Sequence, residues 1–371
     1  MRIGVPRERR SGERRVGLTP ESVKKLTASG NGVVIEGGAG AAAGYPDGDY
    51  REAGATVADS AAAWNTDIVV KVDRPTAEEL PLLRPGQVLI AMLQHLTEPE
   101  LVGELARRGV TAFAMDWMPR ITRAQDMDAR SSMSTVQGYE AVVLGAELLP
   151  RMMPMLMTAA GTVAPARVLV IGAGVAGLSA IATARRLGAV VEAFDVRPAT
   201  REQVESLGAR FVAMDTELAD AQDAQGYAKA QSDEILELER HTLAQRLPAM
   251  DLVIPTALIP GKKPPVLLTV AMVESMRPGS VIVDVAAPFG GNCQLTRPGE
   301  VVEHQGVTIV GACDLESRKA YHASQMYSRN VLNYINYLLK DGALKLAFED
   351  ELVSFPLVAH AGEVRAAKGG A

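Results

Sequence analysis

Residues 167–197 read RVLVIGAGVAGLSAIATARRLGAVVEAFDVR, and this stretch decides the fold. It begins with an apolar run, Arg167–Ile171, and passes through glycines in the spacing G-x-G-x-x-G. It continues as a helical pattern and ends with a second apolar run, Val190–Phe194. The order of strand, glycine-rich turn, helix and strand is that of the βαβ unit in doubly wound α/β folds. We therefore predict a parallel sheet with a dinucleotide site where this turn opens the helix.

The three glycines of the turn, Gly172, Gly174 and Gly177, have separate expected tasks. Gly172 permits the tight turn, Gly174 lets the backbone approach a pyrophosphate, and Gly177 allows the helix to pack closely on the strand. The start of the helix adds free N–H groups and the positive end of the helix dipole. A glycine-rich turn without a ligand is the alternative, but the flanking strands and helix favour a nucleotide site.

Asp195, which follows the second strand, predicts which dinucleotide is bound. Its carboxylate can accept hydrogen bonds from the adenosine ribose and repels a 2′-phosphate, which favours NAD(H) over NADP(H). Arg197 complicates this assignment, because an arginine can serve a 2′-phosphate. The other candidate cofactor-binding residues lie beside the turn, beside Asp195 or at the end of a later strand: Val175, Ala176, Val196, Thr256, Ala257 and Leu258.

Short apolar runs alternate with amphipathic stretches through both halves of the 371-residue chain. Further strands are expected at Arg2–Pro6, Gly32–Glu36, Asp67–Val72, Val88–Leu93, Val110–Asp116, Arg210–Met214, Asp251–Thr256, Ser280–Ala286 and Val307–Gly311. Helical patterns cover Pro20–Ser29, Glu98–Arg108, Ser134–Leu156 and Ala323–Lys340. The alternation predicts an α/β protein with two Rossmann-like doubly wound domains. The last long helix suggests that the first domain is discontinuous, with 1–135 joined by 320–371 and the NAD-binding domain at 136–319.

Composition excludes several classes of function. A formal charge of −6 leaves no general nucleic-acid footprint and no basic patch for a membrane surface. The most apolar window, 141–160, is interrupted by charged residues and prolines, so we expect no membrane insertion. Cys293 and Cys313 lack the spacing of zinc ligands, so we expect no metal site. Two cysteines also fit a reducing cytoplasm better than a disulfide framework.

Three further segments carry a resemblance to a known family. They are MPRITRAQDMDARSS (118–132), TALIPGKKPPVLLT (256–269) and GGNC (290–293). Over nearly its whole length the chain resembles the NAD(H)-binding domain I, the soluble alpha subunit, of proton-translocating nicotinamide nucleotide transhydrogenase, whose superfamily includes alanine dehydrogenase. The resemblance implies hydride transfer from NADH to NADP⁺ held by a partner subunit. It also implies a homodimer in the cytoplasm, peripheral to the inner membrane through membrane-bound partner subunits.

The resemblance further implies a loop that holds the dihydronicotinamide. The matching positions are Arg120, Gln125 and Asp128, with Ser131 nearby, and Tyr227 corresponds to the tip of a mobile loop. The residue types agree with these roles. Arg120 and Asp128 can form an ion pair, Gln125 can hydrogen-bond a ribose, and Asp128 or Ser131 can contact the carboxamide. For the loop with Arg120, Gln125 and Asp128, composition alone would favour a solvated, charge-rich turn. For the polar stretch 215–246, which contains Tyr227, a solvated helical insertion is as good an explanation as a lid.

A hydride passed between two nicotinamide rings needs no general acid or base, because no proton moves at the reacting carbon. The alternative function is a stand-alone amino-acid dehydrogenase of the alanine dehydrogenase type. In that case Arg15 and Lys71 would hold a keto acid and His95 would transfer the proton. Each of these residues could instead have a structural role. Arg15 could form a surface ion pair, Lys71 could be a cation at the end of a strand, and His95 could be a hydrogen-bonded loop histidine. Departures from the transhydrogenase pattern at 286–289 and 312–327 leave partner docking and substrate choice open.

Overall fold

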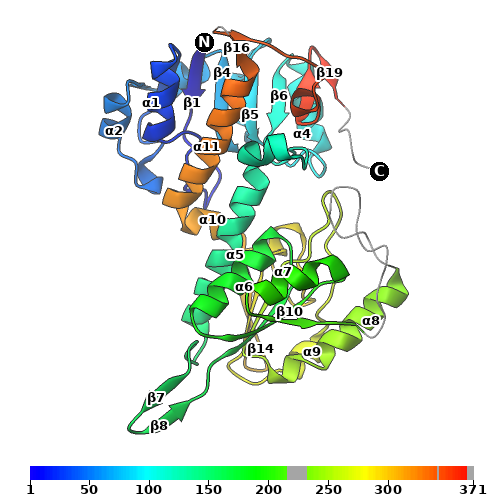
Figure 1. Cartoon of the computed structure of the whole chain (residues 1–371). Coiled ribbons are helices and arrows are strands. Elements are labelled where there is room, and N and C mark those ends of the chain that lie inside the picture. The colour runs from blue at the N-terminus through cyan, green and yellow to red at the C-terminus, as the bar shows by residue number, and fades with distance from the viewer. Residues whose placement is uncertain (215–231, 341, 366–371) are drawn as a thin grey trace. The chain divides into compact units, whose positions relative to one another are not determined.

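A computed structural model describes residues 1–214, 232–340 and 342–365. The chain forms two compact units, one made of Met1–Met133 with Glu316–Ala371 and the other of Ser134–Leu315 (Figure 1). The first unit is therefore assembled from two separate stretches of chain. The predicted nucleotide residue Tyr227 lies outside the described residues, together with the rest of 215–231.

The sheet of the first unit has eight strands in the order β19-β18-β6-β5-β4-β1-β2-β3. Six of them are parallel: β1 (Arg2–Val5), β2 (Gly32–Glu36), β3 (Thr56–Ala58), β4 (Ile68–Asp73), β5 (Val88–Met92) and β6 (Thr111–Ala114). Their order, 3-2-1-4-5-6, is that of doubly wound dinucleotide folds. Near the chain's end, β18 (Leu357–His360) and β19 (Glu363–Val364) extend the sheet antiparallel beyond β6.

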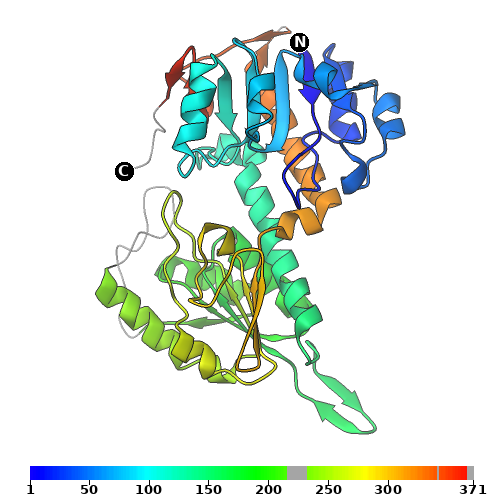
Figure 2. The same ribbon diagram turned by 180° about the vertical axis from the view of Figure 1, so that it is seen from behind.

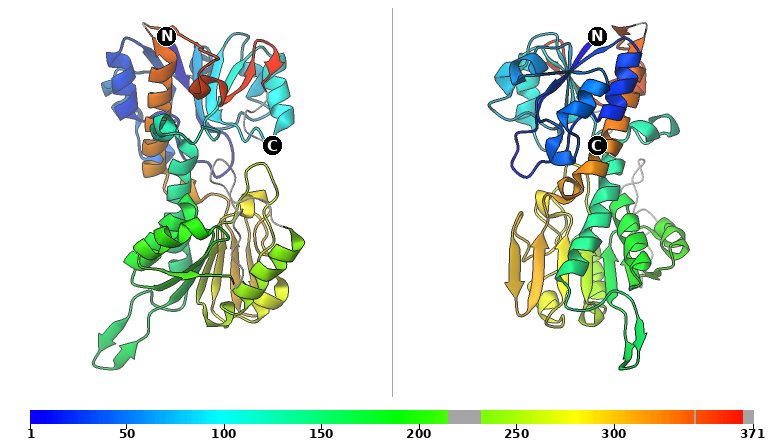
Figure 3. Two further views of the ribbon diagram at one scale, coloured as in Figure 1. Left: turned by 45° about the vertical axis from the view of Figure 1, so that its right-hand side comes forward. Right: turned by 90° about the vertical axis from the view of Figure 1, so that its left-hand side faces the viewer.

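Helices cover both faces of this sheet (Figure 3). On one face, α1 (Pro20–Ala28) packs beside α11 (Ala320–Leu338), where Tyr334 meets Phe113 of β6 edge-on. On the other face, α3 (Ser60–Trp64) and α4 (Pro99–Arg107) pack on a cluster that includes Leu89. The smaller elements are α2 (Asp47–Glu52), α12 (Glu351–Ser354) and the two-stranded ribbon of β16 (Leu339–Lys340) and β17 (Ala343–Leu344).

The second unit contains a seven-stranded sheet in the order β11-β10-β9-β12-β13-β15-β14. Its parallel strands are β9 (Arg167–Ile171), β10 (Val190–Phe194), β11 (Arg210–Val212), β12 (Leu252–Pro255), β13 (Val281–Asp284) and β15 (Val307–Gly311). The edge strand β14 (Val301–His304) is antiparallel. The strand order reverses between β9 and β12, and the carboxyl ends of strands at such a switch point form the binding crevice of open α/β sheets.

Alternate residues of β9 enter two different cores of the second unit. Val168 and Val170 pack with α5 (Ala129–Leu148), α6 (Val175–Arg186) and α7 (Arg201–Ser206). Leu169 and Ile171 pack with α8 (Asp233–Ala244) and α9 (Val270–Glu274) on the opposite face (Figure 2). Because successive side chains of a strand point to opposite faces, the continuous apolar run of β9 is what a strand buried on both sides requires. The predicted class, α/β with two Rossmann-like domains, is confirmed.

The structure corrects the predicted connecting helix. It begins at Ala129 and not at Ser134, because Asp128 accepts a hydrogen bond from the backbone N–H of Ser131 at 2.9 Å and so caps its first turn. It ends at Leu148, shortly before Pro150, which cannot continue a helix. Leu156, the last residue of the expected helix, instead begins a hairpin of β7 (Leu156–Thr158) and β8 (Gly161–Val163). The chain passes back towards the first unit through α10 (Leu315–Arg318).

Within the two large sheets, the four strands β3, β14, β18 and β19 are absent from the sequence-based expectation, as are the short strands of the ribbons β7–β8 and β16–β17. β3 and β14 are short and partly exposed edge strands, so neither has the apolar run that predicts a buried strand. In the ranges that the structure describes, no helix combines the length and the apolar character needed to cross a lipid bilayer.

Candidate functional site

Two glycines of the turn are required by the fold itself. Gly172 has a φ of +96°, a left-handed conformation that side chains disfavour, and a Cβ there would lie 2.7 Å from Oγ1 of Thr256. A Cβ at Gly177 would lie 1.8 Å from the carbonyl oxygen of Gly172. This contact brings the first turn of α6 directly onto the end of β9. The predicted roles of Gly172 and Gly177 in the turn and in helix packing therefore have a visible steric cause.

Gly174 is different, because the fold has no need of a glycine there. Its φ of −77° is open to any residue, and an added Cβ would meet no atom within 4 Å. Gly174 is also the N-cap of α6, and no side chain among the described residues caps that helix end. The N–H groups of the first turn of α6 are thus left to an external acceptor, and the space beside them is open. An anion such as a pyrophosphate matches both features.

Asp195, at the end of β10, is held by four donors. Its Oδ2 accepts from the backbone N–H of Ala173 at 2.7 Å and from Nη2 of Arg197 at 2.7 Å. Its Oδ1 accepts from the backbone N–H and from Nε of Arg197, both at 2.8 Å. The bond to Ala173 ties the carboxylate to the glycine turn, as the predicted nucleotide site requires. The guanidinium of Arg197 lies across both oxygens at the same time.

A second buried carboxyl group, that of Glu239 on α8, lies close enough to Asp195 for the two charges to interact. Burial, together with the negative charge of Asp195, raises the pKa of Glu239 to about 7, and Arg240 offsets this in part. Glu239 is not expected from the sequence, since helical spacing identifies it only as one acidic residue of a polar helix. The neighbourhood of Asp195 therefore contains two carboxyl groups and the cation Arg197.

The strand-end residues of β12 are positioned by hydrogen bonds within the second unit. Oγ1 of Thr256 donates towards the carbonyl oxygens of Ile171 and Gly172, both at 3.1 Å, which joins the ends of β12 and β9. Ala257 is held by the buried side chain of Asn292, which accepts from its N–H at 3.0 Å and donates to its carbonyl at 2.9 Å. Leu258 is half-buried beside them. Val175, Ala176 and Val196 lie next to the turn and to Asp195, as their sequence positions imply.

Asn292 is a residue whose positioning role sequence reasoning missed, although it belongs to the GGNC motif. The fully buried Asp284 accepts from the backbone N–H of Asn292 at 2.8 Å and of Cys293 at 3.0 Å, and so holds the loop after β13. Burial raises the pKa of Asp284, while the hydrogen bonds to its carboxylate act in the opposite direction. A polar residue shortly after the end of a parallel strand was the available signal.

The predicted nicotinamide loop belongs to the first unit and includes a short 3₁₀ helix, Thr122–Met127. The structure brings Asp128 and Ser131 together, because Ser131 donates from both its N–H and its hydroxyl, at 2.9 and 2.5 Å, to the two oxygens of Asp128. Arg120 and Gln125 are exposed. The loop is tied to α11 by Asn330, whose side-chain amide donates to the carbonyl oxygen of Asp126 at 2.8 Å.

Two of the three residues considered for an amino-acid dehydrogenase, Arg15 and Lys71, lie in buried charge pairs of the first unit. Lys71 is only 1% exposed, and its Nζ lies 3.0 Å from Glu79 and 3.1 Å from Glu8. Arg15 forms a bidentate ion pair with Glu13, to which it donates from Nε at 2.8 Å and from Nη2 at 2.5 Å. The interpretation of Arg15 as a surface ion pair is wrong, since its side chain is buried.

The divergent segment 312–327 supports this cluster from α11. The buried Tyr327 donates its hydroxyl to the backbone carbonyl of Lys71 at 2.6 Å, and burial raises the pKa of that phenol further above its usual range. Tyr321, earlier on the same helix, stacks on Tyr45. In the other divergent segment, Ala287–Phe289 forms a 3₁₀ turn that Gly290 closes with a φ of +117°. Both departures thus include regular structure, although Phe289 and Tyr321 are themselves exposed.

His95 is half-buried beside Trp117, which it meets edge-on with 5.3 Å between the ring centroids, and both of its ring nitrogens are buried. Neither ring nitrogen has a hydrogen-bond partner among the described residues, so the interpretation as a hydrogen-bonded loop histidine is wrong. Burial lowers the pKa of His95, because the charged ring is disfavoured away from water, while the charge of Asp116 opposes this shift. The ring is therefore neutral near pH 7.

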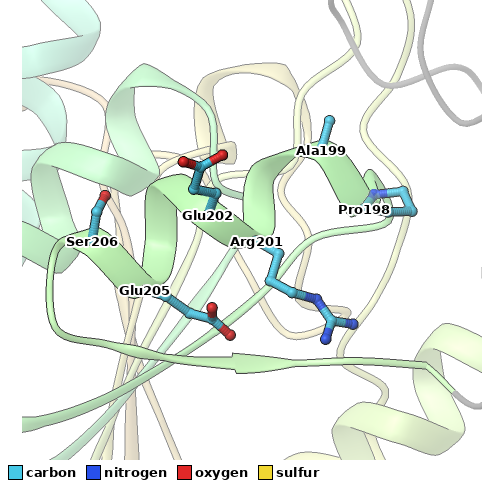
Figure 4. A pocket seen from close by; sticks show the side chains of 6 residues that line it. All are labelled: Pro198, Ala199, Arg201, Glu202, Glu205 and Ser206. Carbon is cyan, nitrogen blue, oxygen red and sulfur yellow. The ribbon is translucent and has the colours of Figure 1, made fainter.

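A surface depression lies beside α7. It is lined by Pro198, Ala199, Arg201, Glu202, Glu205 and Ser206, which all come from one helical segment (Figure 4). None of the predicted site residues lines it. The guanidinium of Arg201 is instead stacked over the ring of Phe211, 5.1 Å from its centroid. The depression therefore adds nothing to the dinucleotide site.

Comparison with known proteins places the whole chain in one family. Residues 4–137 match the family model described as "Alanine dehydrogenase/PNT, N-terminal domain", and residues 141–367 match "Alanine dehydrogenase/PNT, C-terminal domain". The chain is 49% identical to an NAD(P) transhydrogenase alpha subunit of Rhodospirillum rubrum, over 98% of this chain and 97% of that relative. It is 34% identical to alanine dehydrogenase 2 of Staphylococcus aureus, over 84% of this chain and 78% of the relative.

Solved structures give the same result. The crystal structure of a transhydrogenase from Sinorhizobium meliloti matches with a TM-score of 0.89 and 44% identity, over 98% of this chain and 100% of that one. An L-alanine dehydrogenase matches with a TM-score of 0.83 and 31% identity, over 98% of this chain and 96% of that one. The resemblance stated from the sequence is confirmed, and the chain belongs to the alanine dehydrogenase/PNT family.

Proposed function

We propose that this chain is the NAD(H)-binding component of an NAD(P) transhydrogenase, which passes a hydride from NADH to NADP⁺ held by a partner subunit. The single observation that carries the proposal is Gly174, a glycine that the fold does not need, at a helix end that no side chain of the described part of the chain caps. The relatives agree in function, since those with 43 to 49% identity are named as transhydrogenase alpha subunits and the alanine dehydrogenases are more distant.

In this function the chain binds and orients its nucleotide. The N–H groups at the start of α6 receive the pyrophosphate, and Asp195 receives the adenosine ribose. Gln125, with Asp128 and Ser131, binds the nicotinamide half. The bound nicotinamide supplies the hydride, so the protein has only to orient the ring and exclude water.

The dehydrogenase alternative would require Arg15 and Lys71 to bind the carboxylate of a keto acid. In the structure Lys71 already faces two carboxylates of its own chain, and Arg15 chelates a third. A substrate carboxylate would therefore compete with groups that are buried and covalently tethered nearby, which is unfavourable. These pairings favour the transhydrogenase function.

The proposed function predicts hydride transfer only in the presence of a partner. The purified chain is mixed with an NADP(H)-binding transhydrogenase component, and reduction of an NADP⁺ analogue by NADH is followed by absorbance. We expect transfer that depends on both components and no NADH oxidation by the chain with pyruvate and ammonium. Turnover of pyruvate by the chain alone, with no transfer to the partner, would establish the dehydrogenase instead.

We further infer that the chain is a cytoplasmic homodimer that reaches the inner membrane through its partner subunits. The support for a second copy is the hairpin β7–β8, whose Met157 is 79% exposed and which follows two further exposed methionines, Met152 and Met155. Such exposed apolar side chains are typical of association surfaces. We expect a dimer in sedimentation velocity and a shift towards monomer in Met157→Ser. A monomeric wild-type chain at micromolar concentration would contradict the homodimer.

A further inference from the structure

The carboxylate of Asp195 has no acceptor position left for a ribose. A carboxylate offers about four lone-pair positions on its two oxygens. Four donors reach them within 2.8 Å: the backbone N–H of Ala173, the backbone N–H of Arg197, and Nε and Nη2 of the Arg197 side chain. The ribose diol can donate to Asp195 only after one of these donors has left.

Only the guanidinium among these donors can leave without disturbing the fold. The N–H of Ala173 belongs to the glycine turn, and the N–H of Arg197 belongs to the backbone next to Asp195. The guanidinium, by contrast, is carried on rotatable bonds, and its side chain is 13% exposed where that of Asp195 is 4% exposed. Arg197 is therefore the member of the ion pair that lies nearer to solvent and can move.

We propose that Arg197 is a latch that closes over Asp195 in the free protein and is displaced by the adenosine ribose of NAD(H), so that it sets both the affinity and the selectivity for the nucleotide. The inference rests on the proposed NAD(H) site. In the latched state the arginine competes with the ribose for the same two oxygens. In the displaced state its positive charge lies beside the ribose.

The charges around Asp195 give the latch opposite effects on the two nucleotides. Asp195 makes this part of the site negative once the guanidinium is removed, and the nearby Glu239, with a pKa of about 7, adds a partial negative charge. A 2′-phosphate is repelled by such a site, and Arg197 is the cation that can offset the repulsion by pairing with the phosphate. Arg197 therefore weakens the binding of NADH, whose adenosine ribose has a free diol, and strengthens the binding of NADPH.

The test replaces Arg197 by methionine, which keeps an unbranched side chain of similar length and removes all side-chain donors. Binding of NADH and NADPH to the full chain is measured by calorimetric titration at fixed ionic strength. We expect Arg197→Met to bind NADH about 3- to 10-fold more tightly and NADPH at least 3-fold more weakly than the wild type. The ratio of the two affinities should thus change by about an order of magnitude.

Two further variants keep the result interpretable. Arg197→Lys retains the charge but cannot form two parallel hydrogen bonds to the carboxylate, so it should bind NADH more tightly than the wild type and less tightly than Arg197→Met. Its gain over the wild type can be measured even if the methionine variant fails to fold. Arg201→Met removes a nearby arginine that stacks on Phe211 and should change neither affinity. NADH binding that is unchanged or weaker in both Arg197 variants would overturn the latch. A wild-type chain that binds no NADH would instead contradict the proposed function.

Discussion

The variant Gly174→Ala is expected to fold like the wild type and to bind NADH about 100-fold more weakly. The added methyl group meets no protein atom within 4 Å, and the backbone φ of −77° is one that alanine adopts freely. The methyl group does, however, occupy the space above the first turn of α6, where a pyrophosphate must approach the backbone. A loss of this size corresponds to about 2.7 kcal/mol of binding free energy.

The measurement combines a thermal melt without nucleotide with a fluorescence titration of NADH. Gly177→Ala is the matched control, because a Cβ at that position would lie 1.8 Å from the carbonyl oxygen of Gly172. That variant should lose stability as well as binding, since α6 has to move away from β9. Wild-type affinity in Gly174→Ala would show that no ligand group approaches this turn, and the nucleotide site would have to be sought elsewhere.

Gln125→Ala is expected to lower the rate of hydride transfer to the partner by 10- to 100-fold while leaving the free energy of unfolding within about 0.5 kcal/mol. The side chain of Gln125 is exposed on the nicotinamide loop, so the fold gains little from it. If it hydrogen-bonds the nicotinamide ribose, its loss lets the ring turn away from the orientation that transfer needs. Single-turnover transfer from bound NADH measures this step directly.

Arg123→Ala supplies the control on the same loop. Arg123 is 60% exposed and lies near Asp350, with 3.5 Å between its Nη2 and the Asp350 oxygen, so it contacts the protein's own surface. Exposed pairs of this kind contribute little to stability. We expect its transfer rate to stay within about 2-fold of the wild type. Equal losses in both variants would mean that the loop responds to any truncation and that Gln125 has no individual role.

The fold and the geometry of the glycine turn were predictable because their determinants are local. The glycine turn, the strand before it and Asp195 lie within a single stretch of chain, and each glycine has a steric or ligand-related reason that spacing reveals. The same holds for the alternation of strands and helices, since burial on both sheet faces demands continuous apolar runs. The edge strands β3 and β14 escaped prediction because their exposed positions do not need such runs.

The remaining features depend on contacts between residues far apart in the chain. Glu239 lies near Asp195, and Asn292 holds Ala257, only because the sheet brings separate loops together. The four hydrogen bonds to Asp195 could not be predicted either, because they depend on the rotamer of the Arg197 side chain. The pairing of Lys71 with both Glu8 and Glu79 likewise follows from the sheet and not from local sequence.

The return of residues 316–371 to the first unit has a consequence for synthesis on the ribosome. The second unit is complete in the nascent chain once Leu315 has been made, while the earlier unit still lacks α11 and β18. Until then the outer edge of β6 has no neighbour and Phe113 has no Tyr334 to cover it. The unit that is translated second can therefore fold first, and the unit that begins the chain depends on segments that emerge only after the second unit is complete.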